Sequence, residues 1–166
     1  VNAFAVSGTK IFAGIYSSGV FLSTNNGTSW TGVSNGLTNQ DVLALKVSGA
    51  NLFAGTYEGG VILSTNNGMN WTAVNNGLTN THVFSLAVSG TSLFAGTLGG
   101  GVFLTTNNGT SWTAANNGLA NRSISALAVS ETNIFAGTLG GGVFLSTNYG
   151  TNWTAVNYGL TTQYVY

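Results

Sequence analysis

The sequence predicts an all-β protein made of four repeated units, each folded as a small antiparallel sheet. The repeat is marked by four tryptophans, Trp30, Trp71, Trp112 and Trp153, which follow one another at intervals of 41 residues. Self-similarity at a fixed period of this length is typical of repeat architectures. Short runs rich in Val, Leu, Phe and Thr, each ended by Gly or Asn, indicate strands joined by tight turns.

The repeats divide nearly the whole chain. One position of the pattern is occupied by Val1, Val42, Val83, Ile124 and Val165. We therefore place the units at residues 1–41, 42–82, 83–123 and 124–164, and assign residues 165–166 to the start of a fifth repeat. Because the pattern stops inside a repeat and the sequence does not begin with Met, we expect a processed or excised piece of a longer product.

The second unit shows what each repeat builds. It contains the runs VLALKVSG, NLFAGTYEGG, VILSTNNG and MNWTAVNNGL. Asn67-Gly68, between the third and fourth runs, is a strong hairpin signal because both residues tolerate the positive φ that this turn needs. Four antiparallel strands in a unit of this size fit one blade of a β-propeller, whereas a parallel β-helix would lack the tight hairpins. Two arrangements stay open: a closed four-bladed ring, or part of a larger ring or array.

The octapeptide before each tryptophan carries a family resemblance. STNNGTSW, STNNGMNW, TTNNGTSW and STNYGTNW resemble the Asp-box, or BNR, motif S-x-D-x-G-x-x-W, which lies between the third and fourth strands of propeller blades in sialidases, sortilin-like receptors and many secreted bacterial proteins. The matching residues are Ser23, Asn25, Gly27 and Trp30; Ser64, Asn66, Gly68 and Trp71; Thr105, Asn107, Gly109 and Trp112; and Ser146, Asn148, Gly150 and Trp153.

All four boxes depart from the family motif in having Asn where the family has Asp. An Asn oxygen still accepts hydrogen bonds from turn amides, so we expect the turn to close without the charge. The box lies away from the active site in the family, and a tryptophan at blade spacing usually packs. The resemblance therefore implies a structural role for these residues and an extracellular or cell-surface protein, of bacterial origin.

Composition excludes several partners. Charged residues make up only 4% of the chain, and its cations are Lys10, Lys46 and Arg122. Nucleic-acid binding needs a clustered basic face, so we expect none. No apolar run approaches the roughly 20 residues that span a bilayer. The chain has no cysteine and therefore no disulfide or thiolate site.

The sequence also argues against catalysis, metals and cofactors. A sialidase-like site would need several arginines around the substrate carboxylate, and this chain has one. Glycoside hydrolysis needs two carboxylates at a controlled separation; the acidic residues are Asp41, Glu58 and Glu131, and the last is expected on the opposite side of the blades. His82 has no paired ligand spacing with Asp41 or Glu58. We expect no enzyme, metal or cofactor, and a glycoside hydrolase fragment is the least favoured alternative.

The loops that differ most between repeats are the candidates for ligand binding. In a propeller, the crossovers between blades share one side with the hairpins between second and third strands. On that side the repeats diverge, although neutral drift of solvated loops also produces such variation. The candidate ligand-binding residues are Tyr16, Asp41, Tyr57, Glu58, His82, Arg122 and Tyr164.

Two hypotheses of different classes follow for a non-catalytic repeat scaffold. In the first, the crossover side recognises a glycan or a protein. In the second, the chain is a self-assembling building block of a surface layer or filament, and its first and last blades associate because their outer sides repeat surfaces that already pack between neighbours. Near-zero net charge removes repulsion that would oppose this assembly.

Overall fold

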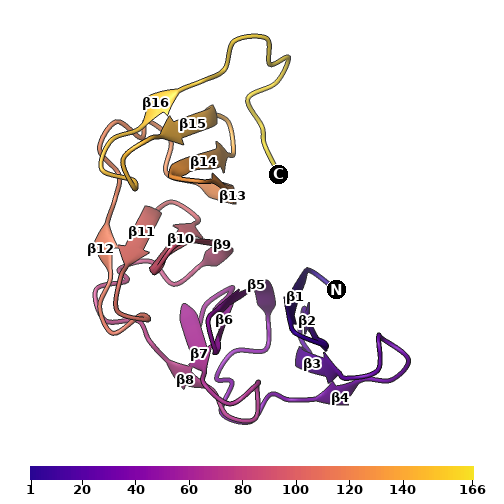
Figure 1. Ribbon diagram of the computed structural model, residues 1–166. Coiled ribbons are helices and arrows are strands. Elements are labelled where there is room, and N and C mark those ends of the chain that lie inside the picture. Colours follow the sequence, from indigo (N-terminus) through magenta and orange to yellow (C-terminus); the bar gives the residue numbers. More distant parts are fainter.

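The computed structural model describes all 166 residues and contains sixteen strands and no helix (Figure 1). The strands form four antiparallel sheets in the orders β1-β2-β3-β4, β5-β6-β7-β8, β9-β10-β11-β12 and β13-β14-β15-β16. Each sheet lies within one of the 41-residue repeats, and the prediction of four-stranded antiparallel units is confirmed. No helix long and apolar enough to cross a membrane is present.

Each blade has three strands of four to seven residues and a fourth strand of two. The first blade has β1 (Ala3–Ser7), β2 (Lys10–Ile15), β3 (Gly19–Ser23) and β4 (Thr31–Gly32). The second has β5 (Val42–Ser48), β6 (Asn51–Thr56), β7 (Val61–Ser64) and β8 (Thr72–Ala73). The third has β9 (Val83–Ser89), β10 (Ser92–Thr97), β11 (Gly101–Thr105) and β12 (Thr113–Ala114). The fourth has β13 (Ile124–Ser130), β14 (Asn133–Thr138), β15 (Gly142–Ser146) and β16 (Thr154–Ala155).

Two-residue turns join the first and second strands of every blade. In the first three blades the turn begins with Gly8, Gly49 or Gly90, at φ of 58° to 59°. In the fourth blade Glu131 takes this position at φ 56°. A glycine adopts this conformation without steric penalty, whereas a residue with a Cβ does not. The fourth blade therefore keeps the turn at the expense of local strain.

The hairpin between third and fourth strands has the turn geometry that its Asn-Gly pair predicts. Asn67 and Gly68 have φ of 59° and 82°. The side-chain oxygen of Asn66 accepts hydrogen bonds from the Ser64 hydroxyl, at 3.0 Å, and from the Asn70 amide, at 2.9 Å. Asn25, Asn107 and Asn148 make the equivalent bonds in the other blades. An uncharged Asn therefore closes this turn in each repeat.

The hydrophobic core lies between blades. One cluster joins the first and second blades, the next joins the second and third, and the last joins the third and fourth. Close approach depends on a glycine in each second strand: a Cβ on Gly55 would lie 2.7 Å from Cγ1 of Val83 in the next blade. The absence of a side chain at Gly55 allows the two blades to pack directly.

The blades are arranged as an open arc (Figure 1). β1 packs against β5, β5 against β9 and β9 against β13, so the first strands line the concave side. The first and last blades face a gap and do not meet. Of the two arrangements left open by the sequence, the structure is therefore not a closed four-bladed ring.

Candidate functional site

The crossovers and the hairpins between second and third strands are hydrogen-bonded to one another. The Gly60 amide donates to the Thr81 carbonyl at 3.0 Å within the second blade, and the Tyr57 amide donates to the Asp41 carbonyl at 3.1 Å across the first junction. Each crossover thus contacts the hairpin of its own blade and that of the next. We call the candidate residues on these segments the crossover row; they are Tyr16, Asp41, Tyr57, Glu58, His82, Arg122 and Tyr164.

Asp41 is held at the first junction by its own blade. Its carboxylate accepts hydrogen bonds from the Ser17 amide, at 2.9 Å, and from the Ser17 hydroxyl, at 3.0 Å. The Asp41 amide donates to the Asn39 side chain at 2.8 Å. The carboxylate is therefore tied to the hairpin between β2 and β3 of its own blade.

Tyr57 and His82 form an aromatic stack at the second junction. Their ring centroids are 4.7 Å apart and the rings lie within 9° of parallel. The His82 backbone is anchored by the Asn80 side chain, which accepts from its amide at 3.0 Å. Glu58 follows Tyr57 directly and is exposed. The stacked rings of Tyr57 and His82 are therefore next to an exposed carboxylate, that of Glu58.

The remaining members of the crossover row are spread along the arc. Tyr16 lies on the first hairpin and is 55% exposed. Arg122 lies at the third junction, where its carbonyl accepts from Gly99 and Gly101 at 3.0 and 2.9 Å while its side chain is exposed. Tyr164 follows the last blade and lies close to Gly140. Tyr57 contacts Asp41 through a backbone hydrogen bond and His82 through ring stacking. Arg122 and Tyr164 lie one and two junctions beyond His82.

The acidic residues do not share one site. Asp41 and Glu58 lie in the crossover row, whereas Glu131 lies in the turn between β13 and β14. No group of three or more His, Asp or Glu side chains comes together with metal-binding geometry.

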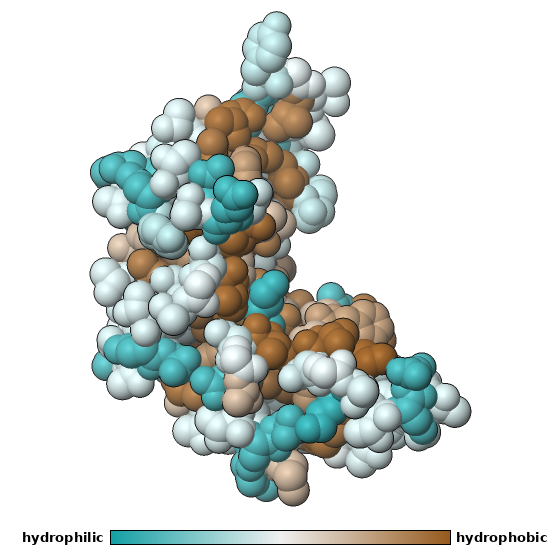
Figure 2. Space-filling view, viewed as in Figure 1, coloured by the Kyte–Doolittle hydropathy of each residue, from teal (hydrophilic) through white to brown (hydrophobic).

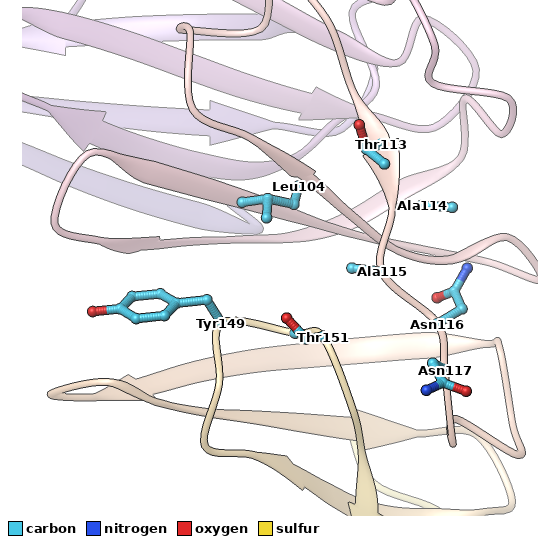
Figure 3. Close-up of a pocket in the computed structure, with 9 residues that line it drawn as sticks. Leu104, Thr113, Ala114, Ala115, Asn116, Asn117, Tyr149 and Thr151 are labelled. Atoms are coloured by element: carbon cyan, nitrogen blue, oxygen red, sulfur yellow. The ribbon is translucent and has the colours of Figure 1, made fainter.

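An open groove of about 300 Å³ lies where the third and fourth blades meet (Figure 3). Leu104 and Thr113–Asn117 of the third blade line one side, and Tyr149 and Thr151 of the fourth line the other. This groove is not among the sites predicted from the sequence. One difference between the repeats does mark this place in the sequence. Tyr149 stands where the other three repeats have Asn at this turn position, and it still adopts φ 55°.

Comparison with known proteins identifies the fold. No protein-family model matches the sequence, and no curated protein matches it. Among solved structures, an ancestral GH74 enzyme matches with a TM-score of 0.74 and 24% identity over 89% of this chain and 22% of that one. The extracellular domain of a putative one-component system from B. thetaiotaomicron matches with a TM-score of 0.76 and 18% identity, over 96% and 23% of the chains.

A GH74 xyloglucanase from Xanthomonas campestris matches with a TM-score of 0.71 and 15% identity, over 98% of this chain and 31% of that one. The chain therefore spans between 22% and 31% of the length of these three structures. At these identities the similarity establishes β-propeller blades.

Proposed function

We propose that this chain is a non-catalytic, extracellular propeller module of the Asp-box type and that its crossover row binds a carbohydrate. The observation that carries the proposal is the Tyr57–His82 stack beside the exposed Glu58. These residues occupy positions at which the otherwise similar repeats differ. The third blade has Leu98 and Gly99 where the second has Tyr57 and Glu58.

The chemistry of the crossover row suits a sugar. Pyranose rings have apolar faces that pack on aromatic side chains, and their hydroxyls need a few well-placed polar groups for orientation. Tyr16, Tyr57 and His82 supply the aromatic surface. Glu58 and Asp41 supply acceptors for sugar hydroxyls, and the Asp41 carboxylate is already fixed by Ser17.

Non-catalytic binding fits the placement of the carboxylates. Hydrolysis of a glycosidic bond usually needs two carboxylates on either side of the bond. Asp41 is hydrogen-bonded to Ser17 of its own blade, and Glu131 lies in the turn between β13 and β14 of the fourth blade. The shared fold with GH74 enzymes, one of them a xyloglucanase, and with an extracellular domain supports a glycan-related role outside the cell.

A glycan array tests the proposal. We expect the 166-residue chain to bind a defined set of glycans, and a variant with Ala at Tyr16, Asp41, Tyr57, Glu58, His82 and Arg122 to lose those signals. A matched control carries Ala at Leu98 and Ser123, which occupy the Tyr57 and Asp41 positions in other repeats, and should keep them. Undiminished binding by the six-site variant, or no glycan binding by the parent, contradicts the proposal. Release of sugars from a bound glycan would contradict the non-catalytic assignment.

A further inference from the structure

The outer side of the first blade is an exposed apolar surface. Phe4 and Val6 are 60% and 61% exposed, and Trp30 is 39% exposed. The Phe4 and Trp30 rings lie 6.4 Å apart and border a cavity of about 420 Å³. All six residues that line this cavity are hydrophobic; they are Val1, Phe4, Ala13, Ile15, Phe21 and Trp30. We call this surface the first-blade face.

The other three blades show what covers this surface. In each of them the preceding blade packs on the equivalent side, and the tryptophans there are 4% to 5% exposed. The indoles of Trp71, Trp112 and Trp153 each donate a hydrogen bond of 2.7 to 2.8 Å to a carbonyl of the preceding blade. Phe4 is exposed, whereas Leu45 and Leu86 at its position are 6% and 7% exposed and Leu127 is partly buried. The structure therefore contains three examples of the surface that fits the first-blade face.

The outer side of the last blade presents that complementary surface. Leu160 is 48% exposed, whereas Leu37, Leu78 and Leu119 at the same position are 5% to 7% exposed. A Cβ on Gly159 would meet no atom within 4 Å, whereas those on Gly36, Gly77 and Gly118 would meet the carbonyl oxygen of a tryptophan in the next blade. We call this side, with Val156 and Leu160, the last-blade face.

We infer that the first-blade face binds the last-blade face of a second copy of this chain, head to tail. In that junction the Trp30 indole donates to the Val156 carbonyl, as the indoles of the later repeats do to Val33, Val74 and Ala115. Leu160 becomes buried against the first blade. The chain carries no net charge that would oppose the contact.

The open arc holds the first-blade face and the last-blade face of one chain apart, so a second copy supplies the contact. The first and last blades of the arc face a gap, and apolar side chains gather on both sides of it (Figures 1 and 2). Two arcs joined head to tail bury both pairs of faces if the ring closes, and longer assemblies bury all but the outermost pair. Both outcomes use the same contact.

The two chain ends compete for one position in this junction. Val165 lies against Gly137 as Val42, Val83 and Ile124 lie against the second-strand glycines of the blades before them. Val1 of the second copy belongs at the same position of the repeat. Removing Val165 and Tyr166 therefore vacates this position, and we expect the shortened chain to associate more tightly.

Light scattering coupled to size exclusion, over a concentration series of the 166-residue chain, tests the contact. We expect a mass at least twice that of one chain. Trp30→Asp and Leu160→Asp should each weaken association by at least about 30-fold, as loss of a central interface residue does. Both residues are partly exposed in the single chain, so both variants should keep the circular-dichroism spectrum of the parent.

Mixing the two variants decides the geometry. The Leu160→Asp chain keeps an intact first-blade face and the Trp30→Asp chain an intact last-blade face, so a head-to-tail contact should restore a heterodimer at one junction. A parent that stays monomeric at all concentrations overturns the inference. So does a mixture that fails to associate. A single variant that associates by itself as tightly as the parent also overturns it, because pairing of two identical faces would leave that face intact in one of the two variants. None of these measurements involves a glycan, so the test is independent of the proposed carbohydrate binding.

Discussion

The indole nitrogen of Trp71 donates a hydrogen bond of 2.7 Å to the backbone carbonyl of Val33, in the preceding blade. The same bond links Trp112 to Val74 and Trp153 to Ala115. Each of these three tryptophans lies on the hairpin between the third and fourth strands of its own blade, and its side chain contacts the preceding blade. The tryptophan at the end of the box therefore joins blades as well as capping its hairpin.

Replacing Trp71 should destabilise the junction between the first two blades. Trp71→Ala removes a side chain that is 4% exposed together with its hydrogen bond, and we expect a loss of about 3 to 5 kcal/mol in the free energy of unfolding. Trp30→Ala is the matched control, because Trp30 is 39% exposed and no blade packs on its outer side in this structure. Urea denaturation of both variants, at a concentration where the parent is monomeric, should show a much smaller loss for Trp30→Ala. Equal losses would contradict the junction role.

Glu131→Gly should stabilise the fourth blade. Glu131 is exposed and has φ 56° where the other three repeats have glycine. Glycine relieves the steric cost of this conformation but increases the entropy of the unfolded chain, so we expect a net gain of about 0.5 to 1 kcal/mol in unfolding free energy. Ser89 bonds to the carbonyl of residue 131, which the substitution keeps.

The reverse substitution in the third blade is the control for this prediction. Gly90 has φ 58° and open space around it, so a side chain there meets no neighbour and only the backbone strain changes. Gly90→Glu should lower the midpoint of thermal unfolding while Glu131→Gly raises it. Changes of the same sign in both variants would show that backbone conformation does not determine the effect.

Asn66→Ala should weaken the second blade, and Asn66→Asp should not. The Asn66 oxygen accepts from the Asn70 amide and from the Ser64 hydroxyl, and Ser64 is 1% exposed. Alanine leaves this buried hydroxyl without an acceptor, at an expected cost of about 1 to 2 kcal/mol. Aspartate retains the oxygen and adds charge-assisted hydrogen bonds. Thermal melts of the two variants against the parent check the prediction; a large loss with Asp would mean that the turn requires a neutral side chain.

Features set by neighbouring residues could be predicted from the sequence. The four-stranded sheets follow from short β-rich runs, and the positive φ of Asn67 and Gly68 follows from their identity. The placement of Asp41 and Tyr57 on one side follows from propeller connectivity. These predictions needed no knowledge of how one blade is oriented against the next.

Features that depend on the angle between blades could not be predicted. The open arc depends on that angle, and so does the absence of a contact between the fourth blade and the exposed Trp30. A sequence in which Trp30 and Trp71 occupy equivalent positions of one repeat gives no sign that one is exposed and the other buried. The groove beside Tyr149 likewise forms between two blades and belongs to neither repeat alone.

Gly55→Ala should separate the second and third blades, whereas Gly137→Ala should be tolerated. A Cβ at position 55 would lie 2.7 Å from Cγ1 and 3.2 Å from the carbonyl oxygen of Val83, which is fully buried and paired within its own sheet. Relief of that clash requires the blades to move apart, at a cost of about 1 to 3 kcal/mol. At position 137 the neighbour is Val165, a partly buried residue outside the sheets, which can shift at little cost. Chemical denaturation of the two variants measures the difference, and an equal loss in both would mean that strand conformation, and not contact between blades, requires the glycine.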